Sequence, residues 1–248
     1  MTNGLLIAVG ILVLLSVSLE LGFRAGRRTI EDGDTRAGSQ VGAIQGALLG
    51  LLGLLLAFSF AAAGARFLER QDLILQEANA IGTASLRADL LDEPYRGTLR
   101  GVLRRYTEHR ISLSANLQSG LPEGAEREID RMQGEMWRAA RDGVAAKPGV
   151  MMGVLPPVNE VIDLHATRLA AGYKHVPSLV MGLLVSCSAL AIGVIGYACG
   201  LGRRRRVPLT MSLAVLVGAA LWITIDLDHP RAGLLILNDA PLKALRFD

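Results

Sequence analysis

Four apolar stretches, each long enough to cross a lipid bilayer, constrain this chain more than any other feature of its sequence. They cover residues of about 4–23, 41–65, 177–200 and 207–225. A helix rises about 1.5 Å per residue, so stretches of this length span the roughly 30 Å hydrocarbon core. The residues are 51% hydrophobic and 20% charged, and the two kinds lie in separate blocks. The sequence therefore predicts an all-α integral membrane protein with four transmembrane helices, two before and two after a polar domain.

The polar segment between the second and third spans carries helix signals throughout. Apolar residues recur there at spacings of three and four, and no run alternates as a strand would. We expect the second span to continue as one helix to about Leu91. Further helices are expected at 94–116 with Asp92 as its cap, at 123–146, and at 157–175, the last leading directly into the third span. The predicted parts are 1–65 with spans one and two, 66–176 as the extramembrane helical domain, 177–226 with spans three and four, and 227–248 as a tail.

Arginines mark the two short loops that join consecutive spans. The first loop holds Arg24, Arg27, Arg28 and Arg36, and the second holds Arg203 to Arg206. Short loops rich in Arg and Lys stay in the cytoplasm. We therefore expect both loops inside, the domain 66–176 and both chain ends in the periplasm, and the protein in the cell inner membrane.

Small residues form a stripe along the second span and another along the third. The stripes comprise Gly42, Gly46, Gly50, Gly53, Ala57, Ala61 and Gly64 on the second, and Gly182, Ser186, Ala189, Gly193, Gly196 and Gly200 on the third. Such stripes let helix backbones approach closely in lipid. Either the two stripes pack against each other, or the stripe on the second span faces a symmetry axis and lines a pore. In the second case Phe58 or Phe60 forms a hydrophobic constriction that gates by dewetting.

Two acidic residues are candidates for function. Glu20 is the only ionisable residue inside an apolar span, where acids mark functional sites, although it lies close enough to the interface to pair with Arg24. Glu77 and Asn79 lie among small and apolar neighbours on the extension of the second span. They either form interhelical hydrogen bonds that fix the domain, or form a ring of side chains around an axis.

A third polar feature is a stripe of arginines at spacing four, Arg96, Arg100 and Arg104. Residues four apart share one face of a helix. The stripe either lines an anion vestibule or is a solvated face paired with acids such as Glu93 and Glu108.

Several classes of function lack their sequence signals. No nucleophile elbow, phosphate loop or cluster of Cys and His at metal spacing is present. The formal net charge is only +3, and no basic face is interleaved with aromatic residues, so we expect no nucleic-acid partner. The residues thus indicate neither an enzyme nor a cofactor.

Two segments resemble the signatures of the bacterial bestrophin-like membrane family. One comprises Glu69-Arg70-Gln71, the run from Gln76 to Ala84 with Glu77 and Asn79, and Leu86-Arg87-Ala88-Asp89-Leu90; the other is Asp226-Leu227-Asp228-His229-Pro230 with Gly233. The family is distantly similar to the bestrophins, which are pentameric anion channels whose second span lines the pore. Bestrophins also bind calcium through an acidic segment after the fourth span.

The resemblance implies an ion channel made of several copies, with calcium at Asp226 and Asp228. Two carboxylates supply too few oxygens for calcium unless backbone, water or a neighbouring subunit completes the shell. Bestrophins keep their large domain and termini in the cytoplasm, whereas the arginine loops here favour the periplasm.

Two functions therefore remain open. The first is a homo-oligomeric channel for an inorganic ion, with Gly46, Gly50, Gly53 and Ala57 facing the pore and Phe58 or Phe60 as the gate. The second is a non-conducting membrane sensor or scaffold whose helical domain binds a partner while the spans only anchor it in the bilayer.

Overall fold

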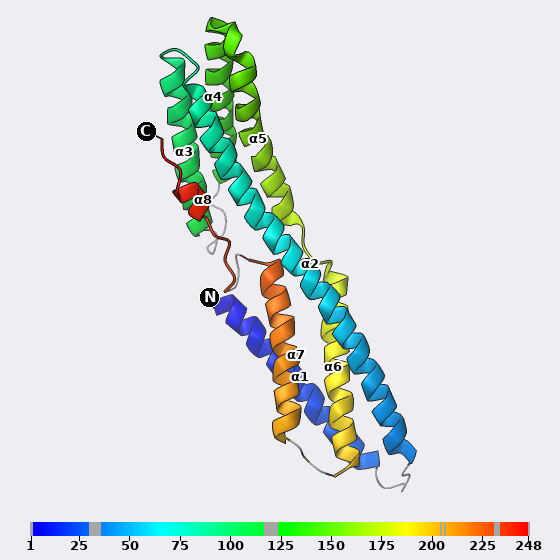
Figure 1. The fold of residues 1–248 in the computed structure, drawn as a ribbon. Helices are drawn as coiled ribbons and strands as arrows, with labels where there is room; N and C mark the ends of the chain where they lie inside the picture. Colours follow the sequence, from blue (N-terminus) through cyan, green and yellow to red (C-terminus); the bar gives the residue numbers. More distant parts are fainter. Residues whose placement is uncertain are drawn as a thin grey trace. The chain divides into compact units, whose positions relative to one another are not determined.

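The computed structural model describes residues 2–29, 36–116, 124–203, 205, 207–230 and 234–247, and within these ranges the chain has helices and no strand (Figure 1). The helices are α1 (Thr2–Arg28), α2 (Arg36–Ala88), α3 (Tyr95–Asn116), α4 (Ala125–Ala146), α5 (Met151–Tyr173), α6 (Ser178–Leu201), α7 (Val207–Asp228) and α8 (Ala240–Lys243), with one 3-10 turn at Pro148–Val150. Four helical stretches are long and apolar enough to cross a membrane. The all-α prediction with four spans is confirmed. Arg204, Arg206 and Gly233 lie outside the described residues.

The chain divides into two compact units. The membrane unit comprises Met1–Phe67 and His175–Leu235, and the polar unit comprises Leu68–Lys174 and Ile236–Asp248. The first part of α2 belongs to the membrane unit and the remainder to the polar unit. The segment from Ile236 onward belongs with the polar unit, a grouping that the sequence did not indicate.

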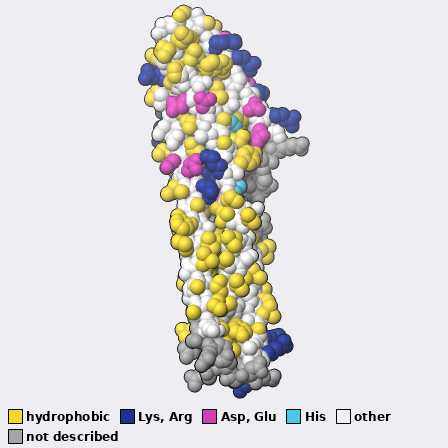
Figure 2. Space-filling view, turned by 90° about the vertical axis from the view of Figure 1, so that its right-hand side faces the viewer, with side chains coloured by type: hydrophobic (Ala, Val, Ile, Leu, Met, Phe, Trp, Pro, Cys, Tyr) yellow, Lys and Arg dark blue, Asp and Glu magenta, His cyan; other side chains and the backbone are white. Residues whose placement is uncertain are grey.

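The core of the membrane unit is built mainly from α1, α6 and α7. Buried side chains there include Leu15, Ile192 and Leu221, and Leu52 joins them from α2. Many large apolar side chains of the same unit point outward, among them Leu216, which is 67% exposed. On the face drawn in Figure 2, the coloured side chains of the membrane unit are mainly hydrophobic, with Lys or Arg at one end, whereas acidic, basic and hydrophobic side chains are mixed on the polar unit. An outward apolar surface of this kind suits contact with lipid.

Glycines bring α1 and α6 into backbone contact. A Cβ atom added at Gly22 would lie less than 3.0 Å from the carbonyl oxygen of Gly193, and one added at Gly196 equally close to that of Leu19. Gly26 and Gly200 have the same kind of neighbour on the opposite helix. The expected packing of the α6 stripe against the second span is therefore wrong: its partner is α1.

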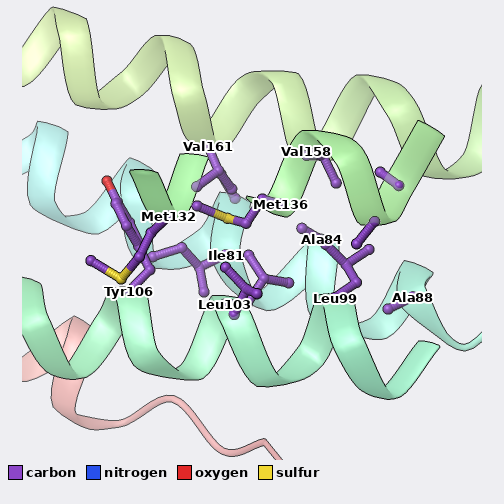
Figure 3. Packing of buried hydrophobic residues seen from close by; sticks show 14 of the residues in the cluster. Ile81, Ala84, Ala88, Leu99, Leu103, Tyr106, Met132, Met136, Val158 and Val161 are labelled. Atoms are coloured by element: carbon purple, nitrogen blue, oxygen red, sulfur yellow. The ribbon is translucent and has the colours of Figure 1, made fainter. Parts of the chain in front are cut away.

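Four helical segments surround the core of the polar unit. Ile81 from α2, Leu103 from α3, Met136 from α4 and Val161 from α5 meet there, all almost fully buried (Figure 3). Leu242 of α8 is buried in the same cluster. The helix periodicity in this part of the sequence thus reflects a conventional helical bundle core.

Two predicted helix boundaries need correction. α5 begins at Met151 and ends at Tyr173, and residues 174–177 are not helical, so it does not lead directly into α6. Pro177 disfavours the helical conformation of Val176, and the Val176 N–H donates to Asp228 instead. Before α3, the Glu93 side chain accepts a helix N–H, that of Gly97, at 3.1 Å. The Asp92 carboxylate accepts from Lys147 instead, and only the Asp92 backbone carbonyl accepts from the first turn of the helix.

The arginine stripe on α3 is a solvated, paired face. Arg96 lies 2.8 Å from Glu93, Arg100 lies 2.9 Å from Asp89, and Arg104 lies 3.9 Å from Glu108. The charges of all three guanidinium groups are compensated locally, which gives no support to an anion vestibule.

Candidate functional site

Glu77 is the centre of a buried polar cluster in the polar unit. Its side chain is fully buried, and its Oε1 accepts a hydrogen bond of 2.6 Å from the Tyr106 hydroxyl. Arg110 lies 3.3 Å from the same oxygen, and Arg168 pairs with Oε2. Burial raises the pKa of Tyr106 to about 12, so a neutral hydroxyl donates at physiological pH. One carboxylate therefore joins α2, α3 and α5.

The burial of Glu77 favours one of its two predicted roles. A carboxylate with no exposed surface inside its own unit suits interhelical hydrogen bonds rather than a ring of side chains around an axis. Asn79 and Arg87 lie on the surface of the same unit. The interhelical role fits Glu77, whereas Asn79 does not share it.

The neighbouring motif Glu69-Arg70-Gln71 holds the end of α5 and the C-terminal segment. Arg70 is buried and donates to the carbonyl oxygens of Ala171 at 3.1 Å and Lys174 at 2.6 Å. It thereby satisfies carbonyl groups that a helix end leaves unpaired. Gln71 exchanges two hydrogen bonds with the backbone of Asn238, at 2.9 and 2.8 Å.

The second motif, at the end of α7, binds backbone amides of two different segments. The Asp226 carboxylate accepts from the N–H groups of Leu234 and Leu235 at 2.9 to 3.2 Å. Both oxygens of Asp228 accept from Val176 N–H at 3.0 Å, and Arg66 lies 3.8 Å from its Oδ1. The two carboxylates, proposed as calcium ligands, are thus each directed at a separate stretch of backbone.

The small-residue stripe of α2 has no partner within the described part of the chain. No atom lies within 4 Å of a Cβ placed at Gly42, Gly46, Gly50, Gly53 or Gly64. Ala57 is also exposed, and Phe58 and Phe60 are 67% and 46% exposed. The opposite side of α2 carries Leu52, Ser59 and Ala63, which are buried. α2 therefore packs through the side that carries Leu52, Ser59 and Ala63, and presents its smallest residues outward.

Glu20 links the two arginine-bearing loops. It lies 2.8 Å from Arg24 and 3.2 Å from Arg205, and the Arg205 guanidinium lies 4.3 Å from the centre of the Phe23 ring. Glu20 thus makes a polar contact at the end of the spans, and this contact places Arg24 and Arg205 at the same end of the membrane unit.

Comparison with known protein families assigns the chain to one of them. The family profile of the Bestrophin-like domain matches residues 10–242. The chain belongs to the Bestrophin-like family. No curated protein sequence and no solved structure matches it significantly. Membership makes it a membrane protein, and both segments that resembled the family signatures lie within the matched range.

In this Bestrophin-like chain, most members of each polar cluster lie outside the family motifs. Tyr106, Arg110 and Arg168 complete the site of Glu77, and His175 and Val176 lie beside Asp228. Sequence analysis missed these partners because arginines are frequent in this part of the chain and none of these five lies near a motif. The only available signal was a buried acid that required a partner.

Proposed function

We propose that this Bestrophin-like protein is a homo-oligomeric ion channel whose pore is lined by α2. The observation that carries the proposal is the outward stripe of Gly46, Gly50, Gly53 and Ala57, which nothing within the described chain covers. α6 shows that such a stripe in this protein serves close approach to a neighbouring helix. By analogy with the bestrophins, the assembly has five copies.

Apolar surfaces gain little free energy by moving from lipid to another helix. Membrane helices therefore associate largely through the close van der Waals packing that small residues allow. A glycine-rich face around a symmetry axis also leaves open space, which a small inorganic ion can cross. Phe58 or Phe60, both exposed on the same helix, supplies the apolar ring at which water and ions are excluded in a closed state. No enzyme activity, cofactor or nucleic acid enters this proposal.

The first test measures ion flux in liposomes and particle size in detergent. We expect an oligomer that conducts ions, and we expect Phe58→Ala or Phe60→Ala to raise the flux, because a smaller side chain lowers the dewetting barrier. Leu216→Ala is the matched control: this α7 residue is as exposed as Phe58, at 67%, and its replacement should leave the flux unchanged. A monomer, or an intact oligomer in a tight bilayer, would contradict the channel.

A tight bilayer would favour a second function, a scaffold that binds a partner through α3 and α4. A surface groove of about 610 Å³ lies there, lined by Tyr95, Arg105 and Arg138 among others. Specific co-purification of a partner that depends on residues 92–147, without flux, is the result that this alternative requires.

The proposed orientation places the arginine loops in the cytoplasm and the polar unit in the periplasm of the inner membrane. Arg24 and Arg205 lie at one end of the membrane unit, where both contact Glu20, and the inside excess of arginine supports this direction. We expect alkaline phosphatase fused at residue 119 to be active and the same fusion at residue 204 to be inactive. The reverse pattern would overturn the orientation.

A further inference from the structure

We propose that His175, Asp228 and His229 form a binding site for a divalent transition metal, with zinc as the reference ion. His175 lies in the non-helical linker before α6, Asp228 is the last residue of α7, and His229 follows it directly. Their ligand atoms all lie within 4.8 Å of one another. The site belongs wholly to the membrane unit, at the end opposite the arginine loops.

The spacing between each imidazole nitrogen and the carboxylate oxygen is close to that of tetrahedral coordination. Nδ1 of His175 lies 3.4 Å and Nδ1 of His229 lies 3.7 Å from Oδ2 of Asp228. Two ligands at about 2.1 Å from a tetrahedral zinc ion lie about 3.4 Å from each other. The two nitrogen–oxygen separations are therefore close to those around a coordinated ion, while the stacked rings must turn for their in-plane lone pairs to converge on it.

The surroundings hold the carboxylate in place and leave the imidazoles accessible. Asp228 is fully buried, and the Val176 N–H orients its two oxygens. Arg66 approaches Oδ1, the oxygen other than the one that faces the two rings. The histidine side chains are 40% and 50% exposed, so a water molecule can complete a four-coordinate shell. Fixed carboxylates and an open position are usual around bound zinc.

The two imidazole rings are aligned with each other. They are stacked with centroids 4.5 Å apart and planes 8° from parallel. Nδ1 of His175 also lies 3.0 Å from the Asp228 carbonyl oxygen. Nδ1 of His229 lies 3.3 Å from the Ile225 carbonyl oxygen. An Nδ1–H can donate to either carbonyl, so each nitrogen coordinates an ion only in the tautomer that carries the proton on Nε2.

The donor set also selects the kind of metal. Calcium and magnesium prefer oxygen ligands, whereas two imidazoles and one carboxylate suit zinc and its neighbours in the first transition row. A bound ion would fasten the linker before α6 to the end of α7 and thereby hold the two helix ends together.

The test uses full-length protein in detergent, stripped with a chelator and then equilibrated with zinc chloride. We expect one zinc per chain by elemental analysis, and an apparent unfolding temperature that rises with zinc. His175→Gln and His229→Gln should each weaken binding about tenfold or more, since each removes one ligand. His109→Gln, a histidine of α3 in the other unit, is the matched control and should bind as the wild type does.

Three outcomes would overturn the site. Zinc that binds equally well to all three variants is an adventitious ion only, and absence of binding to correctly assembled wild-type protein excludes the site outright. Displacement of zinc by equimolar calcium would point to oxygen ligands instead. Because either histidine variant alone tests the proposal, a folding defect in one of them, seen as aggregation in size-exclusion chromatography, leaves the other to decide.

Discussion

Replacing Glu77 with glutamine should lower the free energy of unfolding by about 3–5 kcal/mol. The substitution keeps the shape of the side chain but removes the negative charge that Arg110 and Arg168 share. Both guanidinium groups are largely buried, with 13% and 11% of their side chains exposed. These two largely buried positive charges would then lose the carboxylate that they share. Chemical unfolding of the purified protein in detergent measures the loss.

Glu69→Gln is the matched control for this experiment. Glu69 lies on the same helix and pairs with Lys174 at 3.2 Å, but the two side chains are 47% and 60% exposed. Exposed pairs contribute at most about 1 kcal/mol, so this variant should unfold close to the wild type. Equal effects of the two substitutions would show that Glu77 does not hold the polar unit together.

Gly22→Leu should destabilise the membrane unit by about 3 kcal/mol or more, at the upper end of overpacking effects. The new side chain would meet the backbone of α6 at Gly193, which cannot move aside as a flexible side chain can. The same change at Gly10 provides the control, because no atom lies within 4 Å of a Cβ there. Unfolding of both variants by increasing SDS, followed by circular dichroism, checks the difference.

A large loss at Gly22 with little change at Gly10 would establish the α1–α6 contact in the membrane-embedded protein. Similar losses at both positions would instead reflect a general effect of leucine on α1. A stable Gly22→Leu variant would mean that the two helices are farther apart than the structure has them.

The helices could be predicted from sequence more fully than their partners. Apolar periodicity and proline positions report local backbone preference, so α3 and α4 begin and end within about two residues of the expected positions. The same glycine spacing occurs on α2 and α6, however, and nothing local distinguishes a stripe that faces a helix of the same chain from one that faces outward. Gly22 and Gly26 on α1, the true partners of α6, form too short a pattern to be noticed.

In the candidate sites, too, single residues could be predicted from the sequence, but the residues that they contact could not. Asp228 and Glu77 were identified because they lie in family motifs, and Glu77 also because an acid among small residues needs a partner. Their partners come from distant helices. A single arginine or histidine on an otherwise polar helix is common on protein surfaces and does not by itself indicate a site. Only the fold brings His175 next to Asp228, 53 residues later in the chain.

The packing of α1 against α6 and α7 also bears on how the protein is made. Glu20 and Arg205 are 185 residues apart in sequence, so α1 leaves the ribosome long before its contact surface exists. Domains fold as units during synthesis. The glycine face of α1 therefore stays in the bilayer without its partner helix while the polar unit is synthesised and folded. Assembly of the membrane unit is therefore a late event in biosynthesis, and a chain truncated before α6 would leave α1 without the helix it packs on.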